Sequence, residues 1–500
     1  MEIKKLKDLI IIGGGINGAG IAADAAGRGL SVLILEANDL ACATSSASSK
    51  LIHGGLRYLE NYEFRLVSDA LAEREILLKA APHITRPMRF RMPHCPYLRP
   101  AWIIRLGLFI YDHLSKRVTL PSSKSIRFDA NSILKSNFSR GFEYSDCWID
   151  DARLVVLNAQ EVIRQGSEVR TRFRVIKAKR ENALWHVIGQ NIDNGKLITW
   201  ISKGLVNATG PWVNIVLDNV LHLGSRYKVR LIKGSHIILP KIHSEKYAYI
   251  LQNEDHRVVF VIPWMNKFSL IGTTEVEYHD DLHNPVISNE EIMYLLNVCN
   301  NFFNKKLFKE DIIWSYSGIR PLYDDESNCP QSITRQYTLD IHDVNGSAPL
   351  LSVFGGKLTT YRKLAEEALN MLSKYYPFVR PAWTENNILP GGDFIGTIQN
   401  YASDLYDRYN FIGKSLAQRY ACTYGSNSEL ILKGKTKISD LGEDFGQNLY
   451  EAELSYLVDN EWVYEVPDVI WRRTKLGLWL SKKEMRRISE WLTKNHNKIY

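Results

Sequence analysis

Residues 8–20 read DLIIIGGGINGAG, and residues 31–36 read SVLILE. The first run is an apolar strand that ends in a glycine-rich turn and continues into a helix, and the second is another apolar strand. Gly13 and Gly15 leave room for the backbone to approach a pyrophosphate, and Gly18 lets the helix lie close to the sheet. The pattern predicts a parallel, helix-covered sheet that binds a dinucleotide.

The same unit contains two further contacts for a dinucleotide. The first helical residues, Ile16 and Asn17, present backbone amides toward the phosphates. Glu36 ends the second strand at about the spacing where a carboxylate accepts hydrogen bonds from the adenosine ribose, and it would repel a phosphorylated ribose. A lone glycine-rich turn also occurs in other α/β domains, but the complete strand–helix–strand unit with its acidic end favours dinucleotide binding.

The composition predicts a multidomain globular protein. Five hundred residues exceed a single hydrophobic core, and 45% of them are apolar. Residues 1–7 lack the apolar segment of a secretory signal, so we expect a cytoplasmic location. The six cysteines lie far apart without C-x-x-C spacing, which argues against a disulfide framework or a zinc site. The net charge of +8 suits an anionic membrane, an anionic substrate or nucleic acid equally.

An apolar segment, AWIIRLGLFIY at residues 101–111, is too short to span a bilayer and is interrupted by Arg105. Two interpretations stay open: a helix that lies in a membrane interface, or a buried helix with basic ends. The basic residues that flank the segment are Arg89, Arg91, Arg99, Lys116 and Arg117.

Later segments predict how the domains are arranged along the chain. Residues 203–210 and 349–356 are apolar runs that end in glycine, as expected for returning strands of the nucleotide domain. Residues 229–239, 258–264 and 268–272 are short β-rich runs, which predict an antiparallel, substrate-facing sheet between them. The nucleotide domain is therefore expected to be discontinuous.

Helical periodicity appears in the other parts of the chain. It predicts helices over residues 63–79 and after Lys357. Proline, glycine and asparagine are frequent from residue 377 to 392, which predicts a linker. Residues 401–500, including amphipathic stretches at 450–462 and 482–491, predict a helical accessory domain without a metal-ligand cluster.

Chemically mixed sequence follows Glu36, where residues 44–59 read TSSASSKLIHGGLRYL. The small hydroxyl side chains are dense enough to coat a pyrophosphate, and His53, Arg57 and Tyr58 stand beside a Gly-Gly turn that permits close backbone approach. A polar surface loop is the alternative, since serine-rich stretches usually form loops.

Three cations in later segments are candidate phosphate ligands. Arg320, Arg335 and Lys357 would bind a phosphate strongly if they converged with Arg57, because guanidinium groups bind two oxygens at once and lysine adds a point charge. Any one of them alone is more often a solvated or salt-bridged cation. Gly355-Gly356 precedes a predicted helix, whose N-terminus would stabilise charge on the N1/C2 edge of a reduced flavin.

Taken together, these segments resemble the FAD-dependent glycerol-3-phosphate dehydrogenases, the aerobic, quinone-linked enzymes of bacteria. The similarity extends over nearly the whole chain. The segments that carry it are GGGINGAG, SSKLIHGGLRYLE, GFEYSDCW, LVNATGPW, RLIKGSH, IGTT, YSGIRPL, SVFGGKLTTYRKLAE and, in the tail, YGSNSEL and DLGEDFG.

The resemblance implies oxidation of sn-glycerol 3-phosphate at C2 to dihydroxyacetone phosphate, with hydride transfer to flavin N5 and electrons passing on to ubiquinone. It also implies a homodimer that binds no nucleic acid and associates peripherally with anionic lipids on the cytoplasmic face of the inner membrane. The alternatives are an oxidase that uses oxygen and releases hydrogen peroxide, an amino-acid or amine oxidase, and a non-catalytic flavin-binding module.

The implied fold is α/β, with a discontinuous Rossmann-like FAD-binding domain, an antiparallel β-rich substrate domain and an all-helical C-terminal domain. Residues 1–390 form the oxidoreductase region and residues 391–500 the helical domain. Within the first region, the FAD-binding segments are about 1–80, 145–225 and 315–390, and the substrate or cap segments are about 81–144 and 226–314.

The resemblance also implies the site residues. Those for FAD are Gly13, Gly15, Ile16, Asn17, Gly18, Glu36, Thr44, Ser45, Ser48, Ser49, His53, Gly54, Ala208, Thr209, Gly210, Gly318, Gly356, Lys357, Leu358 and Thr359. Those for the substrate are Arg57, Tyr58, Thr273, Arg320, Arg335 and Lys357.

Removal of the C2 hydroxyl proton requires a base. His236 is the preferred candidate and His53 the second, because a neutral imidazole accepts a proton near neutral pH. A structural role is the alternative for either histidine. Arg320 could stabilise a developing alkoxide in addition to binding phosphate.

Overall fold

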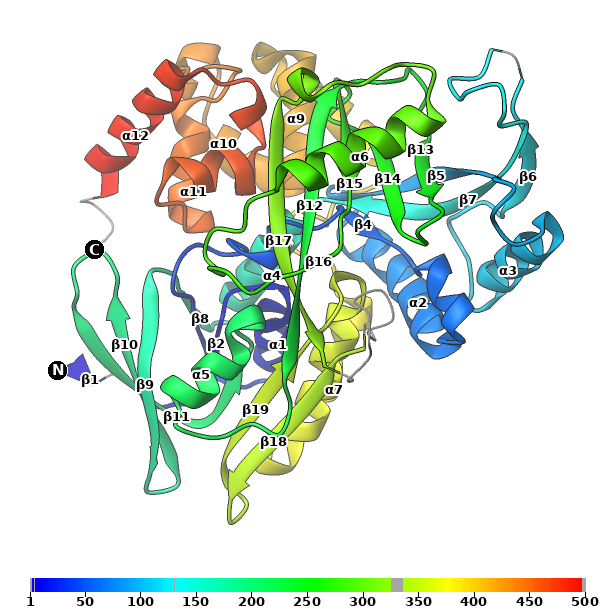
Figure 1. Cartoon of the computed structure of the whole chain (residues 1–500). Helices are drawn as coiled ribbons and strands as arrows, with labels where there is room; N and C mark the ends of the chain where they lie inside the picture. Colours follow the sequence, from blue (N-terminus) through cyan, green and yellow to red (C-terminus); the bar gives the residue numbers. More distant parts are fainter. Residues whose placement is uncertain (1, 4, 130, 325–335, 497–500) are drawn as a thin grey trace.

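The structure is a computed structural model that describes residues 2–3, 5–129, 131–324 and 336–496. Two large sheets and a helical region make up the molecule (Figure 1). The first sheet has a parallel centre in the order β19-β11-β2-β3-β8, and its other strands pair antiparallel with it or with each other, except for the short parallel β1. Its strands are β1 (Glu2–Ile3), β2 (Lys7–Ile12), β3 (Val32–Leu35), β8 (Glu168–Arg170), β9 (Phe173–Glu181), β10 (Leu184–Asn191), β11 (Leu197–Asn207), β18 (Thr338–Val344) and β19 (Ser347–Phe354).

The central strands of this sheet are buried on both faces. Leu9 and Ile11 of β2 pack under the helices α1 (Ile16–Gly27), α4 (Asp151–Arg164) and α7 (Tyr361–Leu372). Ile10 and Ile12 face the other way, toward β9, β10 and α5 (Val213–Asn219). Burial on both sides explains why the strand reads as a continuous apolar run rather than an alternating one.

The second sheet is antiparallel except for one parallel pair, β13 and β5. The helix α6 (Asn289–Phe302) packs on one face of it, and α2 (Phe64–Ala80) and α3 (Ala101–His113) pack on the other. Its strands are β4 (Leu51–Ile52), β5 (Thr85–Pro93), β6 (Lys124–Arg127), β7 (Arg140–Ile149), β12 (Val229–Pro240), β13 (Ala248–Gln252), β14 (Val258–Trp264), β15 (Phe268–Gly272), β16 (Val276–Glu277) and β17 (Trp314–Tyr323).

The sheets divide the chain differently from the segments expected from the sequence. β4, the last residues of β7 and nearly all of β17 lie in stretches expected to belong to the FAD-binding domain, yet all three strands pair within the second sheet. β17 pairs with β12 along nearly its whole length. The chain therefore passes between the two sheets at the points where the cofactor and substrate regions meet.

The C-terminal region is helical, as the sequence predicts, and has its own hydrophobic core. It lies beside β12 and β17, on the opposite side of the molecule from α2 and α3 (Figure 1). A π-helical turn at Asp468–Arg473 lies between its last two long helices. The helices are α8 (Ile398–Arg408), α9 (Gly413–Tyr424), α10 (Ser428–Leu432), α11 (Glu451–Glu461) and α12 (Lys482–His496).

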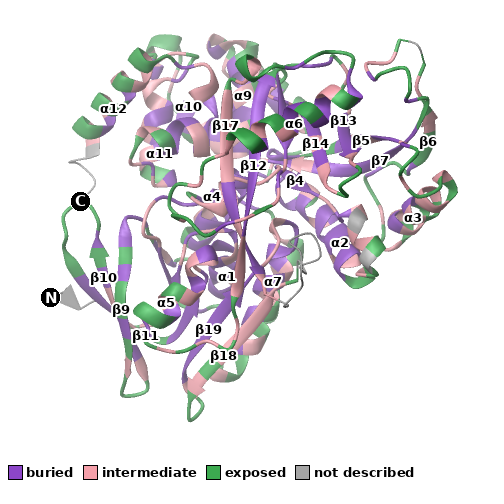
Figure 2. Cartoon of the chain, in the orientation of Figure 1, coloured by how far each residue is buried: buried purple, intermediate pink, exposed green. Residues whose placement is uncertain are grey.

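The apolar segment at residues 101–111 forms α3, and the buried-helix interpretation of it is wrong. Trp102, Leu106 and Phe109 are 69%, 51% and 52% exposed, and only Leu108 and Tyr111 are buried. Figure 2 shows α3 at the periphery with exposed residues along it. Among the described residues, no helix is both long enough and apolar enough to cross a membrane.

Candidate active site

A cavity of about 600 Å³ lies between the two sheets. It opens at the carboxyl ends of the parallel strands, where Ile12, Leu35, Ala208 and Gly355 line it. Ligands of open α/β sheets bind at this edge, and the volume falls in the usual range for ligand and cofactor sites, roughly 300–1,000 Å³.

The glycine turn between β2 and α1 forms one wall of the cavity. Gly13 has a φ of +110°, and a Cβ there would lie 2.6 Å from the Ala208 carbonyl oxygen. A Cβ at Gly18 would lie 2.0 Å from the Gly13 carbonyl oxygen, so the turn has no room for side chains at either position. Gly15, Ile16 and the N-terminus of α1 consequently line the cavity, where a pyrophosphate can approach the backbone.

The carboxylate of Glu36 lies at the end of β3 and lines the same cavity. One oxygen accepts a hydrogen bond from the Gly14 amide at 2.6 Å and the other from the Asn38 amide at 2.8 Å. These two bonds fix the carboxylate beside the glycine turn. An acid beside a glycine turn and a helix N-terminus is the arrangement that binds the ribose and pyrophosphate in Rossmann-type sites, so these residues fit a dinucleotide.

Four hydroxyl residues of the loop, Thr44, Ser45, Ser48 and Ser49, line the cavity, and each also bonds to the protein. Thr44 donates to the Ile319 carbonyl at 2.5 Å, and Ser45 accepts from the Ile16 amide at 3.0 Å. Ser48 donates to the Asp151 carboxylate at 2.7 Å, and Ser49 Oγ lies 2.8 Å from His236 Nε2. These bonds hold the loop against α1, α4 and the second sheet.

Most of the other predicted cofactor residues also line the cavity, and two do not. Gly18 supports the turn from behind, and the Gly54 amide donates to the Tyr111 hydroxyl at 2.9 Å. The remaining residues that do line it are Asn17, His53, Ala208, Thr209, Gly210, Gly318, Gly356, Lys357, Leu358 and Thr359.

Two of the predicted phosphate-binding cations point into the cavity. Arg320 Nη2 donates to Thr273 Oγ1 at 2.7 Å, and its Nη1 lies 3.6 Å from Glu275 Oε1. Gly234 makes room for this guanidinium, because a Cβ there would lie 2.4 Å from Nη2. Lys357 is the second cation that lines the cavity.

Lys357 lies close to two other predicted site residues. Its Nζ donates to the His53 carbonyl at 2.7 Å and lies 5.1 Å from the centre of the Tyr58 ring. Arg335 falls outside the described residues, and so does the side chain of Arg57 in the short helical segment Leu56–Asn61. The structure thus brings together Tyr58, Thr273, Arg320 and Lys357 of the predicted substrate set.

The two candidate bases occupy different places. His53 lines the cavity, and desolvation, followed by the charges of Lys357 and Arg74, lowers its pKa well below the ordinary value. His236 is 1% exposed, stacks on Tyr316 with ring centres 4.8 Å apart and is not among the described residues that line the cavity. Burial, with Arg320 and Lys50, lowers its pKa as well, so both imidazoles are neutral near pH 7.

Sequence reasoning missed several residues of the cavity. Glu275 stands two positions after Thr273 and also lines the cavity, but its proximity to Arg320 depends on strand pairing that the local sequence does not show. Phe260 and Trp212 offered no signal either. Phe260 comes from an alternating strand, and the face that a strand turns toward a site depends on the tertiary structure.

The comparisons with known proteins agree with this geometry. A family described as FAD dependent oxidoreductase matches residues 8–362, and one described as C-terminal domain of alpha-glycerophosphate oxidase matches residues 382–497. A protein of Escherichia coli (strain K12) named aerobic glycerol-3-phosphate dehydrogenase is 66% identical, over 97% of each chain. A protein of Brucella abortus (strain 2308) named D-erythritol 1-phosphate dehydrogenase is 46% identical, also over 97% of each chain.

A solved structure extends the similarity to the whole fold. The glycerol-3-phosphate dehydrogenase of Bacillus halodurans, complexed with FAD, has a TM-score of 0.75 and 26% identity and covers 98% of this chain and 94% of its own. The family match and the FAD-bound neighbour confirm FAD as the dinucleotide of this fold. The chain belongs to the FAD-dependent oxidoreductases and, within them, to the family of the glycerol-3-phosphate dehydrogenases.

Proposed function

We propose that this protein oxidises sn-glycerol 3-phosphate at C2 to dihydroxyacetone phosphate. The observation that supports this most strongly is that Arg320 and Lys357 line the same cavity as the glycine turn and Glu36. The two relatives described above are named as dehydrogenases of phosphorylated polyols. A site with two cations suits such a substrate better than an uncharged alcohol or an amino acid.

FAD would be held by the glycine turn, Glu36 and the loop of residues 44–49. The amides of the turn and the hydroxyls of the loop suit the ADP half of FAD. Gly356 and Leu358 lie where the turn between β19 and α7 enters the cavity. When bound, FAD supplies the acceptor for the hydride that leaves C2.

The substrate phosphate is bound by Arg320, Lys357, Tyr58 and Thr273. A phosphate monoester carries about −1.5 to −2 charges at neutral pH, and a guanidinium that already donates to Thr273 is oriented before the substrate arrives. This fixed arrangement positions C2, so orientation provides much of the rate. Glycerol has no phosphate group to bind to Arg320 and Lys357, so we expect it to bind poorly.

His53 takes the proton of the C2 hydroxyl. As the C2–H bond breaks with departure of the hydride, the O–H bond gives its proton to the imidazole and the C2=O bond forms. The lowered pKa keeps His53 neutral and able to accept this proton. The sequence favours His236 as the base, but the hydrogen bond between its ring and Ser49 suits it better to orienting that cavity hydroxyl.

Ubiquinone is the proposed electron acceptor, reached at the membrane through α3. The exposed side chains of Trp102, Leu106 and Phe109 form an apolar face, and Arg105 lies on the same helix. Such a helix binds an anionic bilayer surface without spanning it. This face favours a membrane-linked acceptor over oxygen, which needs no membrane contact.

Steady-state assays of the purified protein test the proposal. We expect turnover of glycerol 3-phosphate with a soluble ubiquinone analogue, little turnover of glycerol, and far less hydrogen peroxide than reduced quinone. Erythritol 1-phosphate serves as the competing phosphorylated substrate. Peroxide formation at the rate of substrate oxidation would instead identify an oxidase, and equal turnover of glycerol would remove the phosphate from the recognition mechanism.

A further inference from the structure

The loop that holds the cofactor has little regular structure of its own. Residues 36–50 connect β3 to β4, and the only element among them is the single turn Thr44–Ser46. Many of these residues line the cavity, from Glu36 to Ser49. A segment without ladder hydrogen bonds depends on contacts with its surroundings for its conformation.

The beginning of this loop is bound by the helical domain. Asp39 accepts two hydrogen bonds from the Arg473 guanidinium, at 2.7 and 2.8 Å, and a further one from Arg472. The Asp39 side chain is 3% exposed and that of Arg473 is 0% exposed. Although burial alone would raise it, the two guanidinium groups lower the pKa of Asp39, so the carboxylate remains charged.

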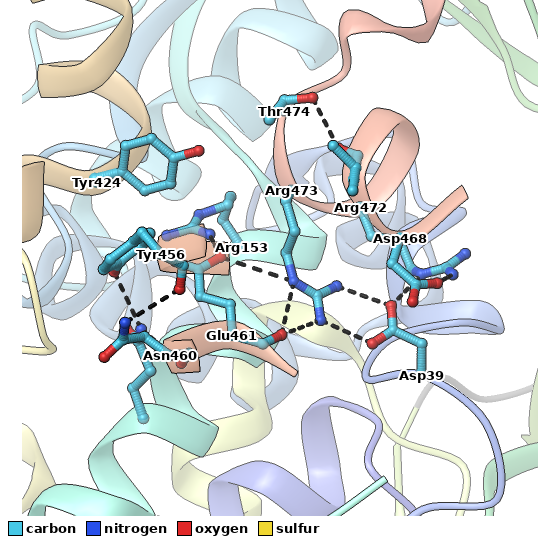
Figure 3. Close-up of polar contacts among 12 residues, drawn as sticks. Asp39, Arg153, Tyr424, Tyr456, Asn460, Glu461, Asp468, Arg472, Arg473 and Thr474 are labelled. Carbon is cyan, nitrogen blue, oxygen red and sulfur yellow. Dashed lines mark hydrogen bonds and ion pairs between the residues drawn. The ribbon is translucent and has the colours of Figure 1, made fainter. Parts of the chain in front are cut away.

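Figure 3 shows how this contact continues into the helical domain. Arg473 also donates to the Glu461 carbonyl, and the Glu461 carboxylate pairs with Arg153 of α4. Asp468 pairs with Arg472 and accepts hydrogen bonds from the amides of residues 464 and 465. The π-helical turn is thereby held rigidly where it meets the loop.

The end of the loop is bound through α4. Lys475 Nζ donates a hydrogen bond to the Asp150 carboxylate at 2.5 Å. Asp150 directly precedes Asp151 in the chain. Asp151 in turn accepts from Lys50 at 2.7 Å and from the Ser48 hydroxyl at 2.7 Å. Both ends of the loop are therefore connected to residues 472–475.

A third contact reaches the loop from the second sheet. Trp471 stacks on Trp314 with ring centres 3.9 Å apart and an interplanar angle of 2°. Trp314 in turn packs on Tyr316, whose hydroxyl donates to the Ser48 carbonyl at 2.7 Å. One short segment of the helical domain thus contacts the loop, α4 and the second sheet.

We infer that residues 468–475 act as a clamp on the FAD-binding loop, so that docking of the helical domain and retention of FAD are energetically coupled. Arg472, Arg473 and Lys475 are then positioning residues for FAD, although they do not belong to the cavity lining. Coupling between two sites is reciprocal, so bound FAD must strengthen the docking of the clamp by the same factor by which the clamp strengthens FAD binding.

The first test compares the release of FAD from three variant holoenzymes and from the unchanged protein. Arg472→Met removes one guanidinium from Asp39, and Arg472→Lys restores a cation. The matched control is Arg419→Met, because Arg419 pairs with Glu453 inside the helical domain, and its side chain is 19% exposed against 15% for Arg472. Release is followed by the rise in flavin fluorescence after dilution, and thermal midpoints report general destabilisation.

We expect Arg472→Met to release FAD at least tenfold faster than the unchanged protein, Arg472→Lys to recover part of the difference, and Arg419→Met to stay within twofold. Equal release rates for Arg472→Met and Arg419→Met at matched thermal midpoints would overturn the inference.

The second test needs no substitution. Amide hydrogen exchange is measured on the unchanged protein with and without FAD. We expect FAD to slow exchange in residues 468–475 by a larger factor than in α9, which belongs to the same domain but does not contact the loop. If FAD slowed exchange by the same factor in the two segments, the coupling would be contradicted, whatever release rates the variants show.

Discussion

At the scale of single residues, two of the predicted phosphate-binding cations line the cavity. Arg320 is oriented by its hydrogen bond to Thr273, and Lys357 by its bond to the His53 carbonyl. The sequence predicts these cations because arginine and lysine beside glycine turns are suited to phosphate. It does not reveal that Arg320 lies near Glu275, because that proximity depends on the pairing of β17 with β12.

Replacement of Arg320 tests its role in binding the phosphate. We expect Arg320→Gln to lower kcat/KM for glycerol 3-phosphate by about 30- to 1,000-fold, since loss of one partner of a close charge pair costs about 2–4 kcal/mol. The activity with glycerol should change much less. Arg127→Gln, at an exposed arginine of β6, is the control. A proportional loss with both substrates would exclude Arg320 from phosphate recognition.

The two histidines make separable predictions. His53→Gln should lower kcat by about 10²- to 10⁴-fold with FAD still bound, because general-base catalysis contributes about that factor. His236→Gln should have a smaller effect on kcat, since its ring contacts Ser49 rather than the cavity. FAD content and kcat are measured for both variants. A larger loss of kcat in His236→Gln would reverse the assignment.

The sequence could not decide between these histidines. His236 lies on a central strand between Gly272 of β15 and Tyr316 of β17. Strand residues alternate between two faces, and which face meets a cavity is set by the neighbouring strands and not by local sequence.

At the scale of elements, the segments with clear periodicity are predicted best. β14 and β15 have the predicted bounds, and α2 and α3 differ from them by one or two residues. Sheet membership is harder, as β17 shows: the sequence assigns most of its residues to the FAD-binding region, whereas β17 pairs with β12, which is far away in the chain.

The exposed face of α3 predicts membrane binding. We expect Trp102→Glu/Phe109→Glu to weaken co-sedimentation with anionic liposomes by at least tenfold, because each large apolar side chain contributes about 1.5–3 kcal/mol when it leaves water. Activity with a soluble quinone should be retained. Ile395→Glu, at an apolar residue that is 96% exposed shortly before α8, is the control. Equal binding by the double variant and the control would contradict membrane docking through α3.

The buried side chain of His83, which packs against the turn after α9, predicts that the stability of the protein depends on pH. His83 is 5% exposed and packs between Gly391 and Gly425; burial, followed by the charge of Arg153, lowers its pKa to about 3. In the unfolded chain its pKa is about 6.5. Between these values the unfolded state binds the additional proton, so His83 makes the protein less stable as the pH falls, by about 1.4 kcal/mol per unit.

The variant His83→Gln lacks this titration. We expect its thermal midpoint to fall less steeply than that of the unchanged protein between pH 6 and pH 4. Parallel curves over this interval would show that His83 is protonated in the folded state or does not control acid stability.

At the scale of the whole molecule, two sheets enclose the cavity, and the helical domain contacts α4, the loop of residues 36–50 and the second sheet. The sequence predicts this three-part α/β architecture, because the glycine turn, the β-rich middle and the helical tail each have distinct patterns. The crossings of the chain between the sheets were not predictable, since they depend on long-range pairing. The homodimer stays a prediction.

The central claim is that a phosphorylated alcohol is oxidised beside the flavin in this cavity. The most direct test adds glycerol 3-phosphate to the purified holoenzyme without oxygen while the visible absorbance of the flavin is recorded, with glycerol at the same concentration as the comparison. We expect rapid loss of the oxidised flavin spectrum with glycerol 3-phosphate and almost none with glycerol. A flavin that stays oxidised with glycerol 3-phosphate, or is reduced equally by glycerol, would contradict it.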